Sequence, residues 1–110
     1  MKDIKYIVFK NNCETLQITL DKENKIQYNN LSNVIDNEQA TKYLTDLFLI
    51  IKHWDNEYIN TCLIDNNIWS LSIVFTNDIK REYYGKASYP DNFEAFERLI
   101  NRIIKEVYNG

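Results

Sequence analysis

Apolar and polar residues alternate along several stretches of the chain, and this alternation predicts β-strands. Every second side chain of residues 69–76 is apolar, namely Trp69, Leu71, Ile73 and Phe75. Residues 15–20 repeat the pattern with Leu16, Ile18 and Leu20. Because successive side chains of a strand point to opposite faces of its sheet, these apolar sets are expected to face the core. The other face of the sheet is expected to be polar and open to water.

Two other stretches have the periodicity of amphipathic helices, residues 37–54 and 92–108. The first has an apolar stripe of Ala40, Leu44, Leu47, Ile51 and Trp54, and the second one of Phe93, Phe96, Leu99, Ile100, Ile103 and Val107. Strands are expected near 3–10, 14–21, 25–29, 59–65, 68–76 and 79–85. This order predicts the α+β class, with an antiparallel sheet of about six strands and two helices on one face of it.

The two halves of the chain resemble each other. A shift of 55 residues brings eleven identical pairs together, among them Leu16/Leu71, Ile18/Ile73 and Tyr28/Tyr83. The periodicities agree as well, which predicts a βββα unit repeated in residues 1–55 and 56–110, with pseudo-twofold symmetry. Coincidence between two ordinary hairpin-and-helix units is the alternative. In either case residues 1–110 are expected to form a single domain.

The stretch "YYGKASYPDNF", residues 83–93, contains the only proline of the chain and four aromatic residues. Asp91 followed by Glu94 predicts a capping box for the second helix, as Asp36 and Gln39 do for the first. Gly85 aligns with Asn30, and both residue types tolerate positive φ. The stretch is therefore interpreted mainly as a corner between a strand and a helix, and binding is the alternative role.

Composition and motifs argue against several functions. The net charge of −3 does not favour binding to a phosphate backbone. No metal-ligand spacing, glycine-rich phosphate loop or catalytic triad is present, so no cofactor, metal site or catalytic residue is expected.

The only histidine, His53, is expected on the polar side of the first helix, near the exposed Leu49. Cys13 and Cys62 are expected to be reduced and partly buried. With no signal peptide or membrane span predicted, we expect a cytoplasmic protein.

The outer face of the sheet is the predicted contact surface. Its candidate residues are Lys80, Glu82, Tyr84, Lys86 and Tyr89. Tyrosine offers large contact area at little entropic cost, and charges beside it orient a partner. A competing interpretation is that these residues only keep an exposed sheet hydrated. A single-stranded nucleic-acid-binding module, suggested by "KREYYGK", and a small enzyme with an unrecognised site are the competing functions. A homodimer through an edge or the outer face is a further expectation.

The pattern "WSLSIVF…YYG…YPDNFEAFERLI", within residues 69–104, resembles small uncharacterised α+β proteins of bacterial mobile elements. That group includes toxin-immunity proteins and phage anti-defence proteins of the anti-CRISPR type. The resemblance implies a non-catalytic inhibitor that binds another protein, of nuclease or toxin type, and neutralises it. It assigns no site residues, because the matching positions are structural.

Overall fold

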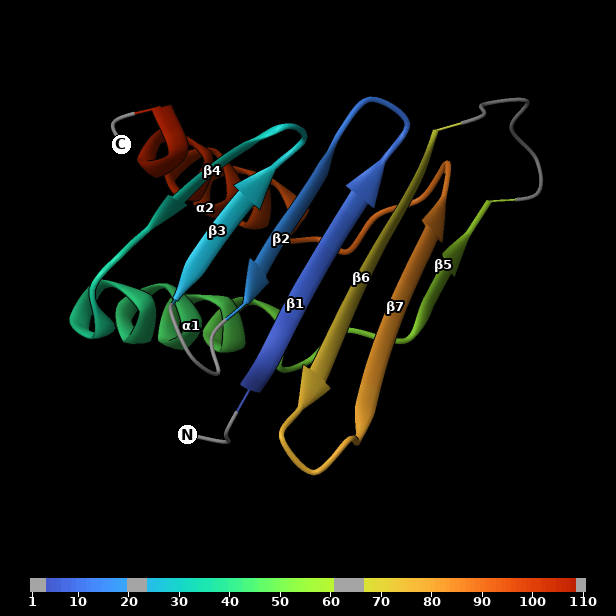
Figure 1. Ribbon diagram of the computed structural model, residues 1–110. Helices are drawn as coiled ribbons and strands as arrows, with labels where there is room; N and C mark the ends of the chain where they lie inside the picture. The colour runs from blue at the N-terminus through green and yellow to red at the C-terminus, as the bar shows by residue number, and fades with distance from the viewer. Residues whose placement is uncertain (1–3, 20–23, 61–66, 109–110) are drawn as a thin grey trace.

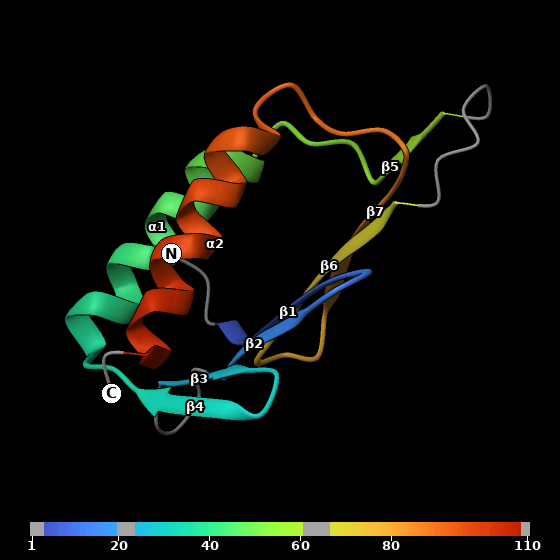
Figure 2. The same ribbon diagram turned by 90° about the horizontal axis from the view of Figure 1, so that it is seen from above.

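The computed structural model describes residues 4–19, 24–60 and 67–108. The predicted core position Leu20 and the cysteine Cys62 lie outside these residues. The strands are β1 (Ile4–Asn11), β2 (Thr15–Thr19), β3 (Lys25–Tyr28), β4 (Leu31–Val34), β5 (Glu57–Ile59), β6 (Ile68–Phe75) and β7 (Lys80–Lys86). The helices are α1 (Asn37–Ile51) and α2 (Phe93–Tyr108). Both helices lie side by side against one face of a twisted sheet (Figures 1 and 2).

The α+β class is confirmed, but the sheet has seven strands instead of about six, in the order β4-β3-β2-β1-β6-β7-β5. The additional strand is β4, which pairs with β3 after a tight turn. Asn29 in this turn has φ 52°, a conformation that asparagine tolerates well. Polar Ser32 and Asn33 gave β4 no apolar alternation, which is why the sequence indicated a loop there.

The sheet is mixed and not purely antiparallel. The edge strand β5 pairs in parallel with β7, and every other pairing among the described strands is antiparallel. A strand was expected at 59–65, but β5 shares only Ile59 with that range, and residues 61–66 lie outside the described chain. Parallel pairing needs a long connection, unlike the tight turns that join the antiparallel hairpins.

The strand order does not follow the predicted repeat. In the first half β2 lies between β1 and β3, whereas in the second half β7 lies between β6 and β5. Only the hairpins β2–β3 and β6–β7 correspond after the shift of 55 residues. The pseudo-twofold βββα unit is therefore not confirmed, because the first strand of each half joins a different neighbour.

The core lies between the helices and the sheet. The predicted inward positions of β6 and β2 are buried, as are Tyr83 of β7 and the apolar stripe of α2. Trp54 follows the end of α1 instead of belonging to it, since the helix stops at Ile51. Its ring lies 5.5 Å from that of Trp69 and 5.2 Å from that of Phe96, between ring centroids. Aromatic packing thus fixes the connection from α1 to β5.

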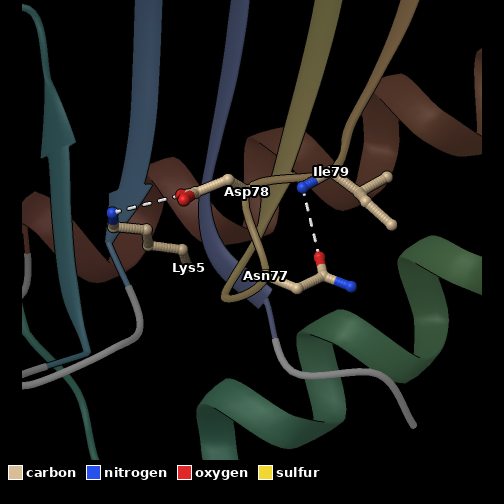
Figure 3. Close-up of polar contacts among 4 residues, drawn as sticks. All are labelled: Lys5, Asn77, Asp78 and Ile79. Atoms are coloured by element: carbon tan, nitrogen blue, oxygen red, sulfur yellow. Dashed lines mark hydrogen bonds and ion pairs between the residues drawn. The ribbon is translucent and has the colours of Figure 1, made fainter.

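A tight turn joins β6 to β7 (Figure 3). The Asp78 amide donates to the Phe75 carbonyl at 2.9 Å, and Asp78 adopts φ 67°. The Asn77 side chain accepts from the Ile79 amide at 3.1 Å. A residue with positive φ in such a turn suits the twist of a hairpin. Lys5 of β1 approaches Asp78 at 3.9 Å, an exposed ion pair that contributes little to stability.

Candidate binding surface

The outer face is the face of the sheet that no helix covers (Figure 2). Strand register and alternation determine which side chains it carries. From β7 these are Lys80, Glu82, Tyr84 and Lys86; from β6, Ile68, Ser70, Ser72 and Val74; from β5, Glu57 and Ile59. From β1 to β3 they are Tyr6, Val8, Lys10, Thr15, Gln17, Thr19, Lys25 and Gln27, followed by Ser32 and Val34 of β4. The predicted polar face is thus interrupted by several apolar side chains.

Two exposed isoleucines flank one of the predicted contact residues. Lys86 lies directly opposite Ile68 of β6 on one side and Ile59 of β5 on the other. Their exposed fractions, 41% for Ile68 and 49% for Ile59, are large for residues within strands. Tyr84 precedes them on the same face and is partly buried. We name Ile59, Ile68, Tyr84 and Lys86 the isoleucine patch.

The charge of the outer face differs from that of the whole chain. Four lysines (Lys10, Lys25, Lys80 and Lys86) and two glutamates (Glu57 and Glu82) give it a formal charge of +2. The complete chain carries −3. A surface of this sign attracts acidic partners and repels basic ones, most strongly at low ionic strength.

The structure brings four of the five predicted site residues together and separates the fifth. Lys80, Glu82, Tyr84 and Lys86 lie in a row on the outer side of β7. Tyr89 was expected to extend this row, but it lies on the helix side. Its ring packs against that of Phe93, with the centroids 4.9 Å apart. The chain turns between Lys86 and Tyr89, where Ala87 adopts φ 54°, and this turn carries Tyr89 away from the outer face.

The first half of β7 also serves a structural purpose. β5 pairs with Tyr84–Lys86, so Lys80, Arg81 and Glu82 form an edge with no further strand among the described residues (Figure 1). Charged side chains on such edges prevent unwanted strand pairing. Lys80 and Glu82 also pair with each other at 3.3 Å. Within the predicted row, Tyr84 and Lys86 are therefore the stronger candidates for a specific contact.

The stretch 83–93, which was predicted to be a corner, differs from the prediction in two respects. Gly85 does not adopt positive φ. An ideal Cβ on it would lie 1.8 Å from Nε1 of Trp69, so the glycine makes room for the indole. Asp91 is not the N-cap of α2, because the helix begins at Phe93 after Asn92. For α1 the expected cap is confirmed: Asp36 accepts from the Gln39 amide at 2.7 Å.

His53, Leu49 and Cys13 are the remaining candidates among the described residues. His53 lies beyond the end of α1 and is exposed, as is Leu49 within that helix. Cys13 is a free, exposed thiol in the β1–β2 turn and not the partly buried residue that was expected. In residues 4–19, 24–60 and 67–108, no three His, Cys, Asp or Glu side chains cluster as metal ligands would. Neither described helix is long and apolar enough to cross a bilayer.

The sequence analysis missed Ile59 and Ile68 as surface residues. Ile68 continues the outward alternation of Ser70 and Ser72 and could have been found from that pattern. Ile59 could not, because its position depends on the parallel pairing of β5 with β7. No protein-family model matches the chain, and no curated protein matches its sequence.

Proposed function

We propose that the protein is a non-catalytic binding domain that inhibits another protein by occupying part of its surface. The observation that carries this proposal is the isoleucine patch on a sheet face left uncovered by the helices. Two exposed isoleucines, with a tyrosine beside them and a lysine between them, combine apolar contact area with a charge that can orient a partner. The cytoplasm is the proposed setting.

The charge of the outer face indicates the kind of partner surface. Its formal charge of +2 complements an acidic surface, and the lysines at its rim would orient such a partner. A nuclease or toxin is the proposed partner class, following the resemblance to immunity and anti-defence proteins of mobile elements. The basic sign implies that this face does not act by mimicking nucleic acid.

The test uses nucleases or toxins encoded beside the gene, each purified and titrated against the protein. The double variant Tyr84→Ala, Lys86→Ala is expected to weaken binding and inhibition by about tenfold or more, because it removes contact area and charge from the patch centre. Its melting temperature should remain unchanged, since both side chains lie outside the core. Lys42→Ala, Lys105→Ala is the control for loss of surface charge, because both lysines are exposed on the helices.

Wild-type affinity of the patch variant for a partner that the native protein binds would contradict the proposal. The helix surface around Leu49 and His53 would then be the next region to test. Static light scattering of the protein alone shows whether a second copy covers the same face. A dimer dissociated by the patch variant would assign the patch to self-association instead of inhibition.

Single-stranded nucleic acid is the second candidate ligand, favoured by one observation. Tyr6 and Tyr84 share the outer face with four lysines, and aromatic rings among basic residues can stack on bases. Fluorescence anisotropy with labelled single-stranded DNA and RNA distinguishes the two functions. Binding that falls steeply with salt and is lost in the patch variant would favour this second function.

A further inference from the structure

A cleft opens on the helix side of the sheet, at one end of its central strands. It lies where the β1–β2 turn, the beginning of β6 and the corner before α2 meet, at the upper end of the strands in Figure 1. Its volume is about 350 Å³. The residues that give it chemical character are Trp69, Tyr89, Phe93, Asn11, Glu14 and Glu97. Neither the isoleucine patch nor the proposed inhibition accounts for this combination of aromatic and acidic side chains.

One wall of the cleft is aromatic, and its rings pack against one another. The ring of Phe93 lies 5.0 Å from that of Trp69 and 4.9 Å from that of Tyr89. The Trp69 indole nitrogen donates to the Ser88 carbonyl at 3.0 Å, and Gly85 leaves room for the ring. Tyr89 remains 43% exposed, so its ring is available to a ligand.

Two carboxylates, Glu14 and Glu97, also line this cleft, and Glu14 is held by hydrogen bonds. Glu14 accepts from Asn11 Nδ2 at 3.0 Å and from the Tyr28 hydroxyl at 2.6 Å. A carboxylate can accept about four hydrogen bonds, so Glu14 retains acceptor capacity. Glu97 of α2 makes no hydrogen bond or ion pair with the described residues, and it is exposed. No lysine or arginine lines this cleft among the described residues.

We propose that this cleft binds a cationic group, a guanidinium or an ammonium, at the end of a flexible chain. The carboxylates would pair with the charge, and the exposed ring of Tyr89, backed by Phe93, would contact the cation or its alkyl stem. The volume is near the lower end for ligand sites, which suits one arginine or lysine side chain or a small amine. Two glutamates without a basic neighbour in the lining disfavour phosphates and other anions.

Two sources can supply this chemistry, an arginine or lysine side chain of a partner protein and a free polyamine. Three probes separate them: spermidine, agmatine, and a capped Gly-Arg-Gly tripeptide. The same tripeptide with citrulline in place of arginine is the matched neutral control, because it keeps the shape of the side chain and removes its charge. Binding is followed by two-dimensional NMR of the ¹⁵N-labelled protein, which resolves the Trp69 indole and the Asn11 side chain.

Saturable shifts are expected at Trp69, Asn11 and Glu97 with at least one cationic probe, and none with the citrulline peptide. Glu97→Gln should weaken that binding by about fivefold or more, because it removes half of the charge. Tyr89→Ala should weaken it as well, whereas Tyr89→Phe should retain it, since the phenylalanine ring keeps the aromatic face. Glu38→Gln is the control for charge, because it makes the same change on α1, outside the cleft.

The pattern among the probes identifies the source. Binding of the arginine peptide and agmatine without spermidine assigns the cleft to a guanidinium, and preference for spermidine assigns it to a polyamine. The proposal is overturned by any of three results: no saturable shift with any cation, equal binding of the citrulline peptide, or unchanged affinity in Glu97→Gln. Ile68 borders both the cleft and the isoleucine patch, so none of the variants alters it.

Discussion

Gly85 determines the packing of Trp69, the largest buried side chain among the described residues. Trp69 is only 2% exposed, and its indole occupies the space beside Gly85 where a Cβ would otherwise lie. The sequence indicated a turn-forming glycine, but the backbone here is ordinary strand. Contact between a glycine and a ring from the adjacent strand cannot be inferred from local sequence, because both β6 and β7 must be placed first.

We expect Gly85→Ala to lower the free energy of unfolding by about 1–3 kcal/mol, because the methyl group would displace the indole and its bond to Ser88. Urea denaturation followed by tryptophan fluorescence measures this change. Ala87→Gly is the matched control two residues away. Ala87 adopts φ 54°, so a glycine there relieves backbone strain but also raises the conformational entropy of the unfolded chain. Because these two effects oppose each other, the free energy of unfolding should change by less than about 1 kcal/mol. Full stability of Gly85→Ala would contradict this account of Trp69 packing.

At the scale of the element, the first turn of α2 shows how tertiary contacts replace a predicted cap. The Asn92 carbonyl accepts from the Ala95 and Phe96 amides, as an N-cap carbonyl does near the helix start. The Asn92 side chain makes its hydrogen bonds with residues at and after the end of α1. Asn92 Oδ1 accepts from the Trp54 indole at 2.6 Å, and Asn92 Nδ2 donates to the Ile50 carbonyl at 2.7 Å. Asn92 therefore joins the start of α2 to the end of α1.

Asn92→Ala is expected to destabilise the protein by about 1–2 kcal/mol, since it removes both bonds and leaves the Trp54 indole without its acceptor. Asp91→Ala is the control beside it. Asp91 is exposed and makes no hydrogen bond with the described residues, so its loss should change stability by no more than about 0.5 kcal/mol. Thermal unfolding of the two variants side by side gives the comparison. If Asp91→Ala lost more stability than Asn92→Ala, Asp91 would instead be identified as the N-cap of α2.

At the scale of the whole molecule, two tyrosines join separate parts of the fold through carboxylates. Tyr28 of β3 donates to Glu14 in the β1–β2 turn, and Tyr43 of α1 donates to Glu106 of α2, each at 2.6 Å. The bond to Glu14, together with burial, raises the pKa of Tyr28 to about 12. Burial, followed by the bond to Glu106, raises the pKa of Tyr43.

Because of these pKa shifts, the free energy of unfolding depends on pH in the alkaline range. The folded state holds the tyrosine protons more tightly than the unfolded state, whose tyrosines titrate near about 10. The stabilisation is therefore complete below pH of about 10 and is lost as pH rises toward about 12. Tyr28→Phe should reduce the slope of unfolding free energy against pH in this window. Tyr84→Phe is the control, because Tyr84 lies on the outer face of β7 and its hydroxyl makes no hydrogen bond with the described residues. An equal effect of both variants would contradict the assignment.

The sequence by itself determined the features that depend on local periodicity. Alternation predicted the buried faces of β2 and β6, helical spacing predicted the stripe of α2, and Asp36 predicted the start of α1, all because neighbouring residues set those patterns. It also predicted the row from Lys80 to Lys86 on the outer side of β7. Only the tertiary structure decided the partners of β5, the separation of Tyr89 from that row, and the roles of Gly85 and Asn92. Each of these depends on contacts between residues distant in the chain, which local periodicity does not encode.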